Sequence, residues 1–129
     1  MHVGKDLVAA SATPMVLAIL AEGESYGYAI IKRVNELSGG ALEWSDGMLY
    51  PLLHRLARLG YVESSWRSAA ETGERRRKYY RLTDAGAEAL SEQRNQWSMV
   101  TETLARVWNE TTGNFSPLAG PQPDGAMAR

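Results

Sequence analysis

Four consecutive cations, Arg75, Arg76, Arg77 and Lys78, are the residues best suited to chemistry with a polyanion. Basic groups that neutralise phosphates release counterions, which supplies nucleic-acid affinity without sequence preference. An isolated run of this kind is more typical of a solvated surface. DNA contact is the favoured interpretation here, because the run lies at the tip of a predicted hairpin and follows a helix that is also basic.

Exposed side chains on the predicted helix Asp46–Leu59 form a second candidate group, with Tyr50, His54 and Arg55 toward its N-terminal half. A recognition helix presents its N-terminal residues to base edges in the major groove. Ser45, just before the helix, can help to hold a phosphate there. Taken alone, the segment fits an ordinary amphipathic core helix equally well.

Seven-residue spacing marks the last predicted helix and indicates a coiled-coil-like dimer seam. The residues that recur at this spacing are Leu90, Trp97 and Leu104, then Val100 and Val107, and finally Thr101 and Trp108. The residues expected at the dimer interface are Leu90, Trp97, Val100, Leu104, Val107 and Trp108. An alternative is an aromatic face that stacks on flat ligands. Both interpretations hold if two Trp97 side chains meet across a dimer.

Enzyme and metal chemistry have no candidate residues. The chain has no cysteine, and neither His2 nor His54 has a partner at the spacing of a metal site. No nucleophile elbow, phosphate-binding glycine loop or pair of carboxylates on a rigid element is present. We therefore expect no enzymatic activity, no metal and no cofactor.

The chain has none of the patterns of a membrane or secreted protein. No apolar run approaches the roughly 20 residues that span a bilayer, and the N-terminus lacks the features of a signal peptide. The absence of cysteine fits a reducing compartment. These observations predict a cytoplasmic protein.

Charge is distributed unevenly along the 129 residues. The net charge of −1 excludes a uniformly basic polyanion binder. Residues 54–81, however, carry a net charge of +5, whereas residues 1–53 and 82–129 carry −3 each. The basic block coincides with the predicted recognition helix and hairpin.

Two helices are predicted near the N-terminus. The first covers Asp6–Glu22, and Pro14 either kinks it or separates a short helix from one that starts at Thr13. The second covers about Tyr26–Leu37, and Ser25 is its expected N-cap.

The helix Asp46–Leu59 completes a set of three, and its predicted apolar face consists of Leu49, Leu52, Leu53, Leu56 and Leu59. Strands at Tyr61–Trp66 and Lys78–Leu82 then form the hairpin.

Thr83 is expected to cap a last helix that extends to about Asn109. After Thr112 the chain is rich in glycine and proline, which predicts a disordered tail.

This order of elements predicts a mainly α fold with a two-stranded β-wing. The expected architecture is a winged helix-turn-helix followed by a long C-terminal dimerisation helix. Residues 1–82 would form the DNA-binding domain, 83–112 the dimerisation helix and 113–129 the tail.

Several stretches together resemble the PadR family of bacterial transcriptional regulators. They are Gly27–Ile30, Gly47–Leu56, Gly60–Val62 and Arg76–Gly86, and with the helix around Trp97 the likeness covers roughly residues 5–108. The short chain with one C-terminal helix is similar to the small subfamily, which includes a lactococcal multidrug-binding repressor.

The resemblance implies a homodimeric repressor whose third helix enters the major groove of a palindromic operator while the wing grips the backbone. The residues that would face DNA by position are Ser45, Gly47, Met48, Tyr50, Pro51, His54, Arg55, Arg75, Arg76, Arg77, Lys78 and Tyr79. Family members usually have threonine at the position of Met48. The hydroxyl contact is lost here, and an apolar contact with a thymine methyl becomes available.

The resemblance also implies a small-molecule effector, planar and either aromatic or cationic, between tryptophans of the two subunits. Residues that would line this ligand site are Trp97, Gln93, Val100, Leu7, Ala10 and Ser11. We therefore expect a repressor that such a molecule releases from DNA. The alternatives are a ligand-independent transcriptional regulator and a protein-interaction module built on the last helix.

Overall fold

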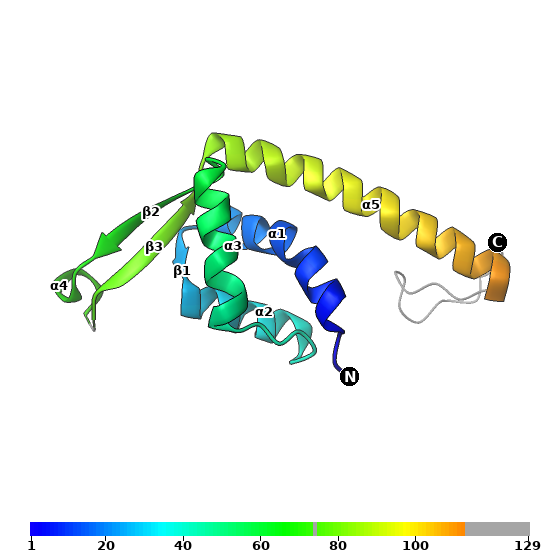
Figure 1. The fold of residues 1–129 in the computed structure, drawn as a ribbon, viewed down its shortest axis with the longest axis horizontal. Helices are drawn as coiled ribbons and strands as arrows, with labels where there is room; N and C mark the ends of the chain where they lie inside the picture. Colours follow the sequence, from blue (N-terminus) through cyan, green and yellow to red (C-terminus); the bar gives the residue numbers. More distant parts are fainter. Residues whose placement is uncertain (74, 113–129) are drawn as a thin grey trace. The chain divides into compact units, whose positions relative to one another are not determined.

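The computed structural model describes residues 1–73 and 75–112. Its elements, in chain order, are α1 (Lys5–Glu22), β1 (Ser25–Tyr26), α2 (Gly27–Ser38), α3 (Asp46–Arg58), β2 (Val62–Arg67), α4 (Ala69–Thr72), β3 (Arg77–Leu82) and α5 (Asp84–Thr112). They confirm the predicted mainly helical fold with a β-wing and a long last helix (Figure 1). Two compact units divide the chain, one of residues Met1–Ser91 and one that begins at Glu92.

Helix α1 continues through Pro14, so the alternative in which Thr13 starts a second helix is wrong. A proline inside a helix costs about 3 kcal/mol, because it removes a backbone donor and crowds the preceding turn. Val16 and Leu17, just beyond the proline, are completely buried. Burying each such side chain contributes about 1.5–3 kcal/mol, which offsets the cost when the helix remains whole.

The expected cap at Ser25 is wrong, because this residue belongs to a short strand. In β1, Ser25 pairs with Tyr80 and Tyr26 pairs with Tyr79 of β3. Helix α2 therefore begins at Gly27, and its N-cap Tyr26 makes no side-chain capping hydrogen bond. The sheet has three antiparallel strands in the order β1-β3-β2, one more than the predicted hairpin.

Helix α3 begins at Asp46 as predicted. Of the two residues that could cap it, Ser45 and Asp46, the structure has Ser45, whose hydroxyl accepts a hydrogen bond from the backbone N–H of Met48 at 3.3 Å. This bond satisfies one of the donors that every helix start leaves open. The helix ends at Arg58, one residue early, and Leu59 is 55% exposed instead of lying on the apolar face.

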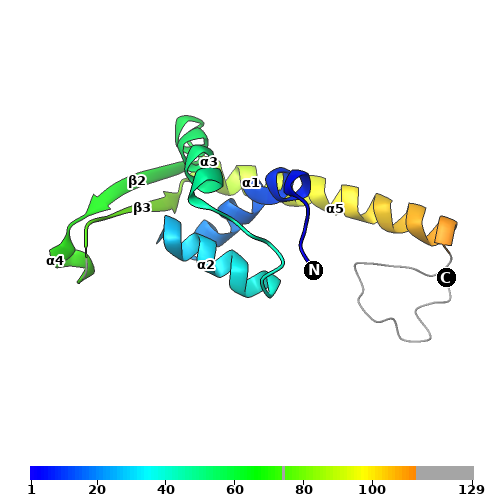
Figure 2. The ribbon, with the colours of Figure 1, turned by 60° about the horizontal axis from the view of Figure 1, so that its bottom comes forward.

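The β2–β3 hairpin extends away from the three N-terminal helices, with α4 at its tip (Figures 1 and 2). Residues Trp66 and Arg67 pair directly with Lys78 and Arg77. The short helix α4 was not predicted. It is held by a capping box, in which Ser68 and Glu71 each accept a hydrogen bond from the other's backbone N–H.

The hydrophobic core lies among α1, α2, α3, the sheet and the start of α5. Its buried residues are Val8, Ala12, Val16, Leu17, Ile19, Leu20, Ile30, Val34, Trp44, Leu49, Leu52, Leu53, Leu56, Val62, Tyr80 and Leu90. Because α3 contributes four leucines to this core, its opposite face is held in a defined orientation toward solvent.

Helix α5 begins where predicted. The Thr83 hydroxyl accepts a hydrogen bond from the backbone N–H of Gly86 at 3.0 Å and donates one to the carbonyl oxygen of Gly60 at 2.6 Å. The helix extends to Thr112, slightly beyond the expected end. The predicted tail, residues 113–129, lies outside the described residues. None of the described helices is long and apolar enough to cross a membrane.

Gly86 occupies a position in α5 where no side chain fits. A Cβ atom built there would lie 2.1 Å from the carbonyl oxygen of Tyr61 and 2.7 Å from a methyl carbon of Leu82. The Tyr61 carbonyl also accepts the backbone hydrogen bond of Thr83, so it cannot move freely. The close approach of α5 to the α3–β2 connection thus requires glycine.

We expect Gly86→Ala to lower the free energy of unfolding by about 1–3 kcal/mol, the usual cost of overpacking. Urea denaturation followed by circular dichroism measures this change. Gly47→Ala is the matched control, because a Cβ at Gly47 meets only the Ser45 hydroxyl at 3.9 Å. Equal stability of Gly86→Ala and wild type would contradict the observed packing.

Candidate nucleic-acid interface

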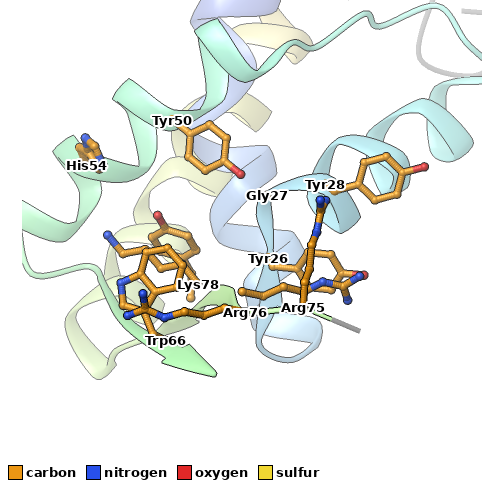
Figure 3. Close-up of a pocket in the computed structure, with 11 residues that line it drawn as sticks. Tyr26, Gly27, Tyr28, Tyr50, His54, Trp66, Arg75, Arg76 and Lys78 are labelled. Atoms are coloured by element: carbon orange, nitrogen blue, oxygen red, sulfur yellow. The ribbon is translucent and has the colours of Figure 1, made fainter. Parts of the chain in front are cut away.

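A cleft of about 730 Å³ lies between α3, the start of α2 and the sheet (Figure 3). It is lined by Tyr26, Gly27, Tyr28, Tyr50, His54, Trp66, Arg75, Arg76, Arg77, Lys78 and Tyr80. None of these described lining residues is acidic. The cleft therefore combines aromatic rings with cations and is electrostatically suited to an anion.

Six of the residues predicted to face DNA are brought together in this cleft. They are Tyr50 and His54 from α3 and the four consecutive cations Arg75, Arg76, Arg77 and Lys78. The α3 residues and the basic run are 21 to 28 positions apart in the sequence, but they line the same cleft in the folded chain. This juxtaposition places candidate base-contacting and phosphate-contacting groups side by side.

The other predicted DNA residues do not line the cleft. Ser45, Gly47 and Pro51 are exposed on and before α3, whereas Met48 is half-buried and packs against the core. The Arg55 guanidinium lies 3.5 Å from the hydroxyl oxygen of Thr13 on α1.

Tyr79 lies on the side of the sheet opposite Lys78, because successive side chains of a strand alternate between faces. The directly paired residues Val62 and Leu82 share one face with Trp66, Lys78 and Tyr80, and we call it the helix-side face because its residues Val62 and Tyr80 enter the core. Ser64, the partner of Tyr80, also lies on this face. The outer face consists of Glu63, Ser65, Arg67, Arg77, Tyr79 and Arg81.

Cations on the outer face are paired with carboxylates. Arg67 forms an ion pair with Glu24, and Arg81 forms one with Glu63, its direct partner across the strands. The hydrogen bond to Glu24 raises the pKa of the Arg67 guanidinium. The positive charges of Arg67 and Arg81 are thus locally compensated.

Tyrosine rings cover two outer-face cations, Arg67 again and Arg77. The guanidinium carbon of Arg67 lies 4.1 Å from the ring centroid of Tyr79, and that of Arg77 lies 4.2 Å from the ring centroid of Tyr26. The two rings meet edge-to-face, with centroids 5.2 Å apart. These contacts offset the repulsion between Arg67 and Arg77, which are direct neighbours across the strands.

Trp66 organises the cations of the helix-side face. The guanidinium carbon of Arg76 lies 4.3 Å from its ring centroid, and the Lys78 Nζ lies 5.9 Å from it. Figure 3 shows both side chains beside the Trp66 ring, with Tyr50 and His54 carried by the neighbouring helix. Unlike Arg67 and Arg81 on the outer face, Arg76 and Lys78 have no carboxylate beside them among the described residues that line the cleft.

The inner wall of the cleft depends on Gly27. A Cβ atom at this position would lie 2.2 Å from the Tyr50 hydroxyl oxygen, so glycine leaves the space that the Tyr50 ring occupies. The nearby Tyr80 hydroxyl is buried and has no hydrogen-bond partner among the residues that the structure describes. Burial, followed by the proximity of Tyr50, raises the pKa of Tyr80.

No cluster of three or more histidine, aspartate or glutamate residues that could hold a metal occurs among residues 1–73 and 75–112. The groups gathered in the cleft are hydrogen-bond donors, cations and aromatic rings. Such groups bind phosphates and bases without making or breaking bonds.

Helix α5 carries the predicted dimer seam, with one correction. Leu90 is buried in the core of the first unit, and the part of the seam that remains at the surface begins at Trp97. Val100, Leu104 and Val107 are 48%, 40% and 51% exposed, and Trp97 and Trp108 are half-buried.

The predicted ligand residues fall into two groups. Leu7, Ala10 and Ser11 lie on α1, where Leu7 and Ala10 are exposed and the Ser11 hydroxyl donates to the carbonyl oxygen of Leu7 at 2.8 Å. Gln93 and Trp97 are half-buried on α5, with Val100 exposed beside them. The two groups belong to different compact units.

Sequence reasoning missed five lining residues: Tyr26, Gly27, Tyr28, Trp66 and Tyr80. Alternation along a strand predicts that Trp66 shares a face with Val62. Its position beside Lys78 follows only from the register between β2 and β3. The register depends on the geometry of the long tip, which the polar sequence between the strands does not reveal. Nothing in the sequence indicated that Ser25 and Tyr26 join the sheet.

The sequence matches the model of the PadR-like transcriptional regulator family over residues 16–92. Transcriptional regulator Rv3488 of Mycobacterium tuberculosis is 41% identical over 85 residues, which cover 66% of this chain and 70% of that protein. Transcriptional regulator YqjI of Escherichia coli is 34% identical over 90 residues, which cover 70% of this chain but 41% of that protein.

Solved structures show the same fold. A transcriptional regulator from Clostridium thermocellum superposes with a TM-score of 0.73 at 25% identity, covering 81% of this chain and 96% of that one. The family match spans α2, α3, the wing and the cleft between them. The chain therefore belongs to the PadR-like family of transcriptional regulators.

Proposed function

We propose that the chain is a cytoplasmic, homodimeric repressor that binds a palindromic operator in double-stranded DNA. The observation that carries this proposal is the cleft in which cations of the wing lie beside the exposed side chains of α3. The residues of α3 read base edges in the major groove, and the wing cations bind the flanking phosphates.

Three features of the first unit support this assignment of roles. Tyr50 and His54 project from a helix whose opposite face is anchored by four buried leucines, so their positions are defined before DNA binds. The exposed N-terminus of α3, with Ser45 and Gly47, offers backbone N–H groups to a phosphate. Arg76 and Lys78 supply charge without competing carboxylates in the described cleft.

A second copy of the chain would complete the binding surface. Palindromic operators are read by two recognition helices about one helical turn, or about 34 Å, apart. The exposed residues Val100, Leu104 and Val107 of α5 follow the seven-residue spacing that pairs helices, and Trp97 and Trp108 flank them. We assign this seam to the dimer interface.

A planar aromatic or cationic molecule at the dimer interface, bound by Trp97, is the proposed effector. The proposal rests on the half-buried Trp97 ring and on the resemblance to the small subfamily, one member of which binds multiple drugs. A ligand that favours another angle between subunits changes the spacing of the recognition helices and so weakens operator binding. The alternatives are regulation without a ligand and a protein-interaction module on α5, which the exposed seam would also serve.

Arg76→Ala should weaken binding to a duplex from the region upstream of the chain's own gene and reduce the slope of log affinity against log salt by about 1. Fluorescence anisotropy across a salt series measures both quantities. Arg81→Ala is the matched control, because it removes the same charge from the outer face, where Glu63 already pairs it. Equal losses in the two variants would argue against the cleft as the DNA site.

Val100→Glu should convert the dimer to a monomer, because burying two unpaired carboxylates at a seam is strongly unfavourable. Sedimentation velocity gives the oligomeric state. Ser98→Glu places the same charge on an exposed polar position of α5 and should leave the dimer intact. A monomeric wild-type chain that captures another protein through α5 would support the interaction-module alternative instead.

Trp97→Ala should abolish binding of ethidium, a planar aromatic cation, followed by the increase in the dye's own fluorescence. Trp66→Phe serves as a control that changes a tryptophan of the first unit. Unchanged dye affinity in Trp97→Ala would place the ligand elsewhere. Absence of dye binding by the wild-type dimer would favour the ligand-independent alternative.

A further inference from the structure

The Trp66 ring lies close to two cations, Arg76 and Lys78. Trp66 is not among the residues proposed above to touch DNA. We propose that Trp66 is a positioning residue for DNA binding, whose indole ring holds Arg76 and Lys78 in the orientation that meets the phosphate backbone. This inference rests on the proposed DNA-binding function and adds a specific physical requirement to it.

The geometry of the wing brings the three side chains together. Trp66 and Lys78 are direct partners in the antiparallel register, so their side chains leave the sheet on the same face. Arg76 precedes β3, and its guanidinium carbon lies 4.3 Å from the Trp66 ring centroid. The Lys78 Nζ lies 5.9 Å from the same centroid, within the range of a cation–π contact.

An aromatic ring positions a cation without cancelling its charge. A carboxylate would hold the guanidinium as well, but it would also compete with the phosphate for the same donors. The ring quadrupole attracts the cation and leaves the N–H groups at the edge of the guanidinium plane available. Ordering these long side chains in advance reduces the entropy that DNA binding must otherwise remove.

Two cations of the outer face differ from those beside Trp66, because carboxylates pair with them. Arg67 stacks on Tyr79 but also forms an ion pair with Glu24, and Arg81 is paired with Glu63. Trp66, Arg76 and Lys78 line the cleft together, and no acidic residue is among its described lining. The arrangement therefore separates cations that stabilise the hairpin from cations that are held for an external anion.

Trp66 makes little contribution to the core. Its side chain is 54% exposed, whereas Tyr80 on the same face is 2% exposed and belongs to the core cluster. Because more than half of Trp66 stays in water, its burial adds little to the stability of the chain. Replacement of Trp66 should therefore alter DNA binding without unfolding the chain.

The test compares Trp66→Leu with Trp66→Phe in the full chain. Leucine keeps an apolar side chain but removes the π-system, whereas phenylalanine retains a weaker one. The probe is a labelled duplex from the region upstream of the chain's own gene, titrated by fluorescence anisotropy across a salt series. A scrambled duplex of the same composition reports non-specific affinity, and thermal denaturation reports stability.

We expect Trp66→Leu to weaken binding to both duplexes about three- to ten-fold, in line with the strength of cation–π contacts. The salt slope should become shallower, because fewer phosphates are neutralised. Trp66→Phe should recover most of the lost affinity. The melting temperature should stay close to that of the wild type in both variants.

A double-mutant design separates positioning from direct contact. In an Arg76→Ala, Lys78→Ala background, Trp66→Leu should cause no further loss, since the residues through which it acts are gone. A full additional loss in this background would overturn the inference, because Trp66 would then contact DNA itself or support the wing. Wild-type affinity and salt slope in Trp66→Leu alone would overturn it as well.

The failure of this inference differs from the failure of the proposed function. If the wild-type chain binds neither duplex, DNA binding itself is refuted and the positioning role falls with it. If the wild type binds and Arg76→Ala weakens it, but Trp66→Leu does not, the proposed function stands and the inference alone is refuted.

Discussion

The antiparallel register between β2 and β3 is the constraint on which the candidate interface depends. Because side chains alternate along a strand, one register determines which cations face the helices and which face away. The pairing of Trp66 with Lys78 puts both on the helix-side face, and the pairing of Arg67 with Arg77 puts these on the outer face. A shift by one residue would exchange the two sets and leave the cleft without its ordered cations.

The same register explains how a chain with a net charge of −1 can present a positive surface. Glu24 and Glu63 neutralise Arg67 and Arg81 of the outer face, so four charges of the sequence cancel in pairs there. On the helix-side face, Arg76 and Lys78 lie against an aromatic ring and keep their charge. Local electrostatics, and not the total charge, therefore decides what the molecule can bind.

Much of the fold followed from local patterns. Helical spacing of leucines predicted α3 and its exposed face, Ser45 and Thr83 acted as the expected caps, and the order of elements indicated the winged fold. The two segments whose structure the sequence did not predict share one property. Ser25–Tyr26 and Ser68–Thr72 adopt structures that depend on pairing with a distant strand or on the geometry of the hairpin tip. Short segments carry too few residues for a periodic signal to reveal such partners.

The sequence by itself determined the four long helices, the wing and the basic block. Apolar spacing, capping residues and charge runs are local properties, so the sequence shows them directly. It also contained the family motifs that the match over residues 16–92 confirmed. Only the tertiary structure decided that Leu90 belongs to the core and that Gly86 is required against Tyr61. It alone brought Arg76 and Lys78 close to the Trp66 ring. Contacts of this kind join residues that are distant in the chain, so no periodic pattern in the sequence reveals them.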